Sequence, residues 1–122
     1  MSDKTQILKL EGISAEASEL LPKKAIRVIY DNLEDINIDA TIDLRTARKV
    51  RKEILEIIEN AALGYCGKYK QVPTAYLSAR LLQEAEVLEE NEQLGNLERY
   101  GLVSYLENLG DPLREVRGSR IK

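Results

Sequence analysis

Apolar residues recur at helical spacing most clearly over residues 44–66, which read LRTARKVRKEILEIIENAALGYC. Spacings of three and four residues place them on one face of a helix, with charged residues on the other face. Gly64 and Gly67 stand where such a helix would end. The pattern therefore predicts a long amphipathic helix whose inner face is formed by Leu44, Ala47, Val50, Ile54, Leu55, Ile57, Ile58, Ala61, Ala62 and Tyr65.

Two shorter helices are predicted before this segment. Ser14 is a suitable N-cap for the first, because its hydroxyl can accept a bond from a free backbone N–H, and Pro22 interrupts that helix. The apolar spacing of residues 23–35 predicts the second. In the connector that follows, Asp39 or Thr41 is expected to cap the long helix.

Helical spacing returns after the long helix. Pro73 suits the first turn of a helix over 74–82, and the pattern resumes over 86–100, where Gly95 weakens it. The pattern leaves open whether 74–100 is one helix or two helices with a bend.

The C-terminal sequence LERYGLVSYLENLGDPLREVRGSRIK allows two interpretations. Gly101 can adopt the left-handed conformation that ends a helix, and Leu102 can then pack back on the last helical turn. The residues after this stop form either another short helix or a β-hairpin. The hairpin would have strands at 103–106 and 115–117 and its tip at 110–112.

A helix that ends on such a turn and is followed by a polar, glycine-containing segment resembles the winged helix-turn-helix superfamily. The resemblance covers residues 44–122, with core helices at 44–65, 74–82 and 86–100 and the hairpin as the wing. It implies contact with DNA or another nucleic acid in a regulatory or replication-associated role. In that arrangement, positive charge lies on or beside the wing at Arg114, Arg117, Arg120 and Lys122.

The third helix of this arrangement is acidic, since residues 84–92 read EAEVLEENE. In DNA-binding members of the superfamily this helix usually enters the major groove and carries basic or amide side chains. Carboxylates in that position would repel the phosphates. Nucleic-acid contact is therefore expected from the wing or from another basic segment, or else the domain binds a protein.

Charge is distributed unevenly along the chain. Residues 41–80 carry eight basic and four acidic side chains, a net charge of +4, whereas residues 1–40 and 81–122 carry net charges of −3 and −4. Electrostatic contact with nucleic acid must therefore come from the middle segment or from the extreme C-terminus.

The basic sequence RTARKVRK, at 45–52, is the second candidate for nucleic-acid contact. Its positive side chains share one side of the long helix and can follow a phosphate backbone. Glu53 and Glu56 lie four residues after two of them, so a solvated face with surface ion pairs is the alternative. The candidate residues are Arg45, Arg48, Lys49 and Lys52.

Arg51 falls inside the apolar stripe of the long helix. An arginine in that position must extend to solvent, pair with a buried carboxylate or face a partner. A buried ion pair is the preferred interpretation.

Composition indicates a folded, soluble protein rather than a disordered one. The chain has 122 residues, of which 32% are charged and 43% hydrophobic, and it lacks Phe and Trp, so the core must consist mostly of Leu, Ile, Val and Ala. The single cysteine, Cys66, cannot form an internal disulfide, and no apolar run approaches the roughly 18 residues of a membrane span. These features predict a cytoplasmic protein.

The chain lacks most of the side chains and motifs that enzymes commonly use for catalysis. The absence of histidine removes the commonest general base and metal ligand, and no glycine motif for phosphate binding occurs. Cys66 has no histidine to activate it, and the carboxylates of 84–92 come from one segment rather than from separate elements. We therefore expect no enzymatic activity, no cofactor and no metal site.

These patterns predict a single, predominantly α domain of four to five helices over residues 1–122. It comprises an N-terminal arm and helices at 1–43 and a tri-helical core at 44–122, and in one version it ends in a small C-terminal β-hairpin, as in a winged helix-turn-helix. Nucleic acid is the first expected partner. A protein partner, including a second copy in a homodimer, is the alternative, and neither a membrane nor a small-molecule substrate is expected.

Overall fold

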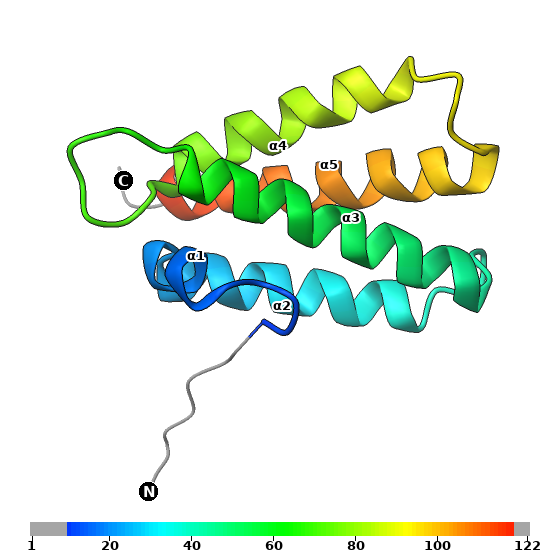
Figure 1. Ribbon diagram of the computed structural model, residues 1–122, viewed down its shortest axis with the longest axis horizontal. Coiled ribbons are helices and arrows are strands. Elements are labelled where there is room, and N and C mark those ends of the chain that lie inside the picture. Colours follow the sequence, from blue (N-terminus) through cyan, green and yellow to red (C-terminus); the bar gives the residue numbers. More distant parts are fainter. Residues whose placement is uncertain (1–9, 119–122) are drawn as a thin grey trace, which may run out of the picture.

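The computed structural model describes the backbone of residues 10–118 and the side chains of residues 10–114. This part of the chain contains no strand and forms α1 (Ala15–Leu20), α2 (Lys23–Asn37), α3 (Leu44–Leu63), α4 (Thr74–Glu89) and α5 (Asn96–Gly118) (Figure 1). Helices α2 to α5 form a four-helix bundle in which successive helices run in opposite directions. The short α1 lies against α3, at the end where α2 begins. The prediction of a mainly α protein is confirmed.

The starts of the first two helices follow the sequence signals. The Ser14 hydroxyl accepts a 3.2 Å hydrogen bond from the backbone N–H of Ala17, which satisfies one of the free donors at the start of α1. Pro22 separates α1 from α2 and occupies the N-cap position of α2. Proline is tolerated there because the missing N–H would have no intrahelical partner.

The prediction that Asp39 or Thr41 caps α3 was wrong. Asp43 occupies the N-cap position, and its carboxylate accepts a 2.8 Å bond from the backbone N–H of Thr46. Asp39 instead closes a local turn, accepting bonds from the backbone N–H and the hydroxyl of Thr41 at 2.9 and 2.6 Å. Its second carboxylate oxygen accepts a bond from Tyr105 in α5, so the Asp39 side chain stabilises the turn and its packing on α5 rather than the start of α3.

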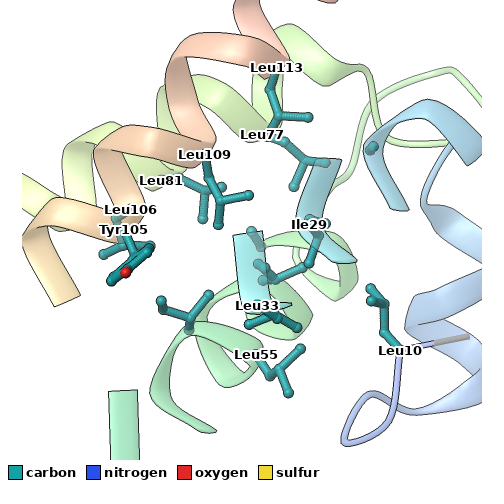
Figure 2. Close-up of a cluster of buried hydrophobic side chains, with 14 of the residues drawn as sticks. Leu10, Ile29, Leu33, Leu55, Leu77, Leu81, Tyr105, Leu106, Leu109 and Leu113 are labelled. Carbon is teal, nitrogen blue, oxygen red and sulfur yellow. The ribbon is translucent and has the colours of Figure 1, made fainter. Parts of the chain in front are cut away.

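Leucine and isoleucine side chains from all four long helices meet in one core (Figure 2). Ile29 of α2, Leu77 and Leu81 of α4, and Leu106 and Leu109 of α5 are fully buried. Each such side chain contributes roughly 1.5–3 kcal/mol by leaving water. Burial of α3 agrees with the predicted stripe except at its two ends, where Leu44 is exposed and Tyr65 lies beyond the helix.

The predicted β-hairpin is absent, because residues 103–117 are helical and belong to α5. The buried side chains of this segment recur at spacings of three and four residues, which is the period of a helix rather than of a strand. A strand would point alternate side chains away from the core and expose half of this set. The stripe consists of Leu102, Tyr105, Leu106, Leu109 and Leu113.

Gly101 does not end a helix, which corrects the predicted helix stop. It lies in the second turn of α5 and is buried, and an added Cβ would come within 3.0 Å of Val50 in α3 and 3.3 Å of Ile42. Glycine at this position therefore favours the close approach of α3 and α5 and does not serve a left-handed turn.

Gly110 also lies inside α5, where it permits contact with α4 rather than forming a wing tip. An added Cβ would lie 2.6 Å from Leu82 of α4. At the same level of the bundle, the buried Ser78 hydroxyl donates a 2.7 Å bond to the carbonyl of Gly110. Pro112 follows within the helix and removes one backbone bond, which the packing of the leucine stripe offsets.

Two helices cover residues 74–118, but their boundaries differ from the prediction. α4 extends to Glu89, beyond the predicted 74–82, and residues 90–95 form the turn before α5. The proposed helix at 86–100 therefore combines the end of α4, this turn and the first residues of α5. Asn91 stabilises the turn, because its side chain accepts a 2.9 Å bond from the backbone N–H of Gln93.

Candidate nucleic-acid interface

A cavity of about 740 Å³ opens at the end of the bundle where α2 and α4 begin. Lys23 and Lys24 from the first turn of α2 line one side, and Tyr69 and Lys70 from the loop between α3 and α4 line another. The described residues that line this cavity include no carboxylate. We call the cavity and these four residues the basic end of the molecule.

Hydrogen bonds to the junction of α1 and α2 hold the loop in place beside the cavity. The backbone N–H of Val72 donates a 2.8 Å bond to the carbonyl of Leu20, and the Val72 side chain is fully buried. The side-chain amide of Gln71 donates to the carbonyls of Leu21 and Glu19 at 3.3 and 3.4 Å. These contacts bring Lys70 next to lysines that precede it by more than forty residues.

Two helix starts face this cavity and add to its positive character. α2 and α4 both follow a proline, Pro22 and Pro73, and neither start has a side-chain cap. The first backbone N–H groups of a helix have no intrahelical acceptor and carry a partial positive charge. Arg27, one turn into α2, lines an adjoining hollow together with Lys23 and extends the positive surface.

Tyr69 projects from the loop with 61% of its surface exposed. The ammonium of Lys68 lies 5.7 Å from the centre of its ring, in cation–π contact. The neighbouring Tyr65 and Tyr76 are used differently, because their rings pack edge to face with centroids 5.0 Å apart. Tyr69 is therefore the aromatic side chain at this end that stays available to a ligand.

The predicted basic stripe of α3 lies toward the opposite end of the bundle, where α3 begins. Its four side chains are exposed on the outer face of α3, as the helical spacing predicted: Arg45, Arg48, Lys49 and Lys52. Asp43 stands beside them, and the pKa of its carboxyl is lowered, chiefly by hydrogen bonds from Thr46 and further by the charges of Arg45 and Lys49. Glu53 and Glu56 are exposed as well, so the face carries both signs of charge.

The predicted basic residues of the C-terminus do not join that stripe. Arg114 is exposed in α5 and pairs with Asp111 at 3.1 Å. The backbone of Arg117 belongs to the last turn of α5, whereas Arg120 and Lys122 lie outside the described residues. Because α5 runs toward the basic end, Arg114 and the α3 stripe stand at opposite ends of the bundle.

Reasoning from the sequence missed the lysines of the basic end. The signal was present in KYK at 68–70, where an aromatic residue lies between two lysines, and in Lys23-Lys24 after Pro22. Neither signal is specific alone, because short basic runs are common on solvated surfaces. Only the hydrogen bonds of the loop to the junction of α1 and α2 bring the two signals to one cavity.

Arg51 and Cys66 are the two remaining residues that the sequence singled out. Arg51 is half-buried, and its Nε makes no hydrogen bond within the described part of the chain, so the expected ion pair with a buried carboxylate is not seen there. Cys66 is exposed in the loop, and its thiol lies 3.5 Å from the carbonyl of Gly64. Among the residues that the structure describes, no three His, Cys, Asp or Glu side chains are grouped to hold a metal ion.

Comparisons with protein-family models, curated proteins and solved structures found no match to this chain. None of the helices in the described range is long and apolar enough to span a membrane.

Proposed function

We propose that this protein is a non-enzymatic helical module that contacts nucleic acid through its basic end. The observation that carries the proposal is the cavity of about 740 Å³ that Lys23, Lys24 and Lys70 line, with no carboxylate among the described lining residues. Lysines neutralise phosphates and release the counterions that surround them, which drives binding at low salt. A concave site can also enclose a phosphate from several sides, which the exposed face of α3 cannot do.

Surrounding features support the same ligand. The free N–H groups at the starts of α2 and α4 favour an anion, and Arg27 extends the positive surface beyond the cavity. The acidic segment at 84–92 lies in and after the last turns of α4, at the opposite end, so it would not face a ligand bound here. A cytoplasmic location belongs to the same proposal, because the only thiol, Cys66, is free and exposed.

The test is binding of a labelled oligonucleotide, followed by fluorescence anisotropy as the salt concentration is raised. Lys23→Gln, Lys24→Gln and Lys70→Gln together should weaken binding at low salt by at least about tenfold. They should also lower the slope of log K against log salt by about 2 to 3. The three side chains are exposed, so their replacement leaves the core unchanged.

A charge-matched control is available on α3. Arg48→Gln, Lys49→Gln and Lys52→Gln remove the same three charges from an exposed face at the opposite end. This variant should keep most of the affinity and of the salt slope. Equal losses in both variants would indicate a response to net charge alone, and a parent protein that binds no nucleic acid at low salt would refute the proposal.

A second function, association with a protein, is favoured by apolar side chains at the end opposite the basic end. Five of them are strongly exposed in or beside the two turns at that end: Ile38 (80%), Leu44, Val87, Leu97 and Tyr100. Single exposed apolar residues are ordinary, but several at one end suit an interface.

Light scattering across a range of concentrations tests this second function in its simplest form, a homodimer. Ile38→Ser with Leu97→Ser should shift the equilibrium toward the monomer, while the lysine variant of the basic end should not. A parent protein that stays monomeric throughout, and that captures no partner through this end, would argue against the idea.

A further inference from the structure

We infer that the basic end takes a single strand rather than a duplex, with a base stacked on Tyr69 and the adjacent phosphate held in the cavity by Lys23, Lys24 and Lys70. The inference rests on the proposed function and adds the class of nucleic acid.

The availability of Tyr69 is the first step. Tyr69 is 61% exposed, so it adds little to the core, and it lines the same cavity as the three lysines. Unpaired bases stack on exposed aromatic rings, whereas the bases of a duplex are already stacked within the helix. An exposed ring beside a phosphate site therefore distinguishes between the two forms of nucleic acid.

The lysines around the ring give the second step. Lys68, the residue before Tyr69, has its ammonium 5.7 Å from the centre of the ring. Lys70, the residue after Tyr69, lines the cavity. Single-strand sites combine such stacking surfaces with cations that follow the backbone. In KYK, the aromatic group and the cations alternate within three residues.

The shape of the site gives the third step. Duplex DNA is usually read by a helix or ribbon that projects into a groove. At the basic end the lysines line a hollow at two helix starts, and the volume of this hollow, about 740 Å³, lies in the range of sites that bind a small ligand. A flexible strand can place one phosphate and one base into a hollow, but a rigid duplex cannot bend its backbone into it.

The anchoring of the loop gives the fourth step. The bond from Val72 to Leu20 and the two bonds from Gln71 fix the loop a few residues beyond Tyr69. A loop anchored this close to Tyr69 has less backbone freedom to lose when a base stacks on the ring, which favours binding.

The experiment compares single-stranded oligomers of thymidine and of uridine, each about a dozen nucleotides long, with a hairpin duplex and with inorganic polyphosphate. All are measured against the full chain by anisotropy or by competition at the same low salt. At least one single strand should bind about tenfold more tightly than the duplex and polyphosphate. The two oligomers distinguish DNA from RNA, and tight binding of either one supports the inference.

Substitutions at Tyr69 provide the decisive comparison. Tyr69→Leu should weaken single-strand binding by about 5- to 100-fold, whereas Tyr69→Phe, which keeps the ring, should change it by less than about threefold. Tyr100→Leu is the matched control, because Tyr100 is 57% exposed but lies at the opposite end. Its effect should be within about twofold of the parent.

The outcomes separate the inference from the function on which it rests. If duplex or polyphosphate binds as tightly as the single strands, or if Tyr69→Leu binds like the parent, the inference is wrong. The proposed function survives that result provided that the lysine variant still loses affinity. If the parent binds none of the probes, both are wrong.

Discussion

The hydroxyl of Tyr105 donates a 2.5 Å hydrogen bond to the carboxylate of Asp39, which ties the middle of α5 to the turn between α2 and α3. The backbone of Tyr105 is held as well, because the buried side-chain amide of Asn32 donates a 3.1 Å bond to its carbonyl. The position of α5 against α2 therefore depends on polar contacts as well as on the leucine stripe.

Removing the hydroxyl of Tyr105 should destabilise the fold without opening a cavity. Tyr105→Phe keeps the buried ring but leaves Asp39 without one of its donors. We expect a lower midpoint of urea denaturation at neutral pH and a largely unchanged helical circular dichroism signal. An unchanged midpoint would show that the contact adds nothing to stability.

The same pair should give the stability a characteristic dependence on pH. Hydrogen bonds from Thr41 and then from Tyr105 lower the pKa of Asp39. Stabilisation by the ionised carboxylate is therefore complete above the ordinary carboxyl pKa, and it is lost as the pH falls below about 4, through the lowered value.

Burial, followed by the bond to Asp39, raises the pKa of Tyr105. The contribution of the neutral phenol is complete below about pH 10 and is lost as the pH rises further.

Asp39→Asn tests the acid limb of this prediction. Its deficit in the free energy of unfolding, relative to the parent, should be present at neutral pH and should shrink as the pH falls below about 4. The measurement is urea denaturation at a series of pH values. A deficit of constant size over that series would contradict the assigned role of the carboxylate.

Pro112 provides a test of helix against hairpin. In the interior of α5 its ring removes a backbone hydrogen bond, so Pro112→Ala should stabilise the protein, by about 1–3 kcal/mol. At the tip of a hairpin the same change would instead loosen a turn and destabilise the fold. The sign of the change in the free energy of unfolding decides between the two, and backbone chemical shifts of residues 103–117 provide an independent check.

Gly110→Ala should destabilise the protein, although helix propensity alone would predict a gain in stability. Alanine favours a helix over glycine by about 1 kcal/mol, but the new methyl group would lie 2.6 Å from Leu82. Overpacking of this kind costs about 1–3 kcal/mol, so we expect a net loss of stability. Gly95→Ala is a control for crowding, because nothing lies within 4 Å of an added Cβ there. Gly95 directly precedes α5 and its carbonyl accepts a bond from the N–H of Arg99, an N-cap position that disfavours alanine, so we expect a loss of less than about 1 kcal/mol. A stabilised Gly110→Ala variant would show that Leu82 moves aside freely.

The leucine stripe of α5 should dominate the stability of that helix. Leu109 is fully buried, and Leu109→Ala should cost about 2–5 kcal/mol. Leu97 lies in the first turn of the same helix and is 49% exposed, so Leu97→Ala should change stability by less than about 1 kcal/mol. Similar losses in both variants, measured by urea denaturation, would contradict the burial of the stripe.

The amphipathic helices were determined by the sequence alone. α3 matches its prediction closely, because its buried apolar face runs from Ala47 to Ala62 and local helix propensity agrees with that pattern. α2 follows from the same agreement between Pro22 and the apolar spacing after it. The outward position of the α3 basic stripe was predictable for the same reason, since helical geometry alone separates the two faces.

The C-terminal half of the protein was decided by tertiary structure. Gly101, Gly110 and Pro112 each disfavour a helix by about 1–3 kcal/mol, and read locally they suggested a stop and a turn. Burial of five stripe residues against three other helices outweighs those preferences, and the two glycines allow the helices to approach. The basic end could not be predicted from local sequence pattern either, because Lys24 and Lys70 line one cavity only when the loop bonds to the junction of α1 and α2. Local pattern thus specifies which residues face inward, while contacts between distant segments decide where a helix can continue and which charges meet.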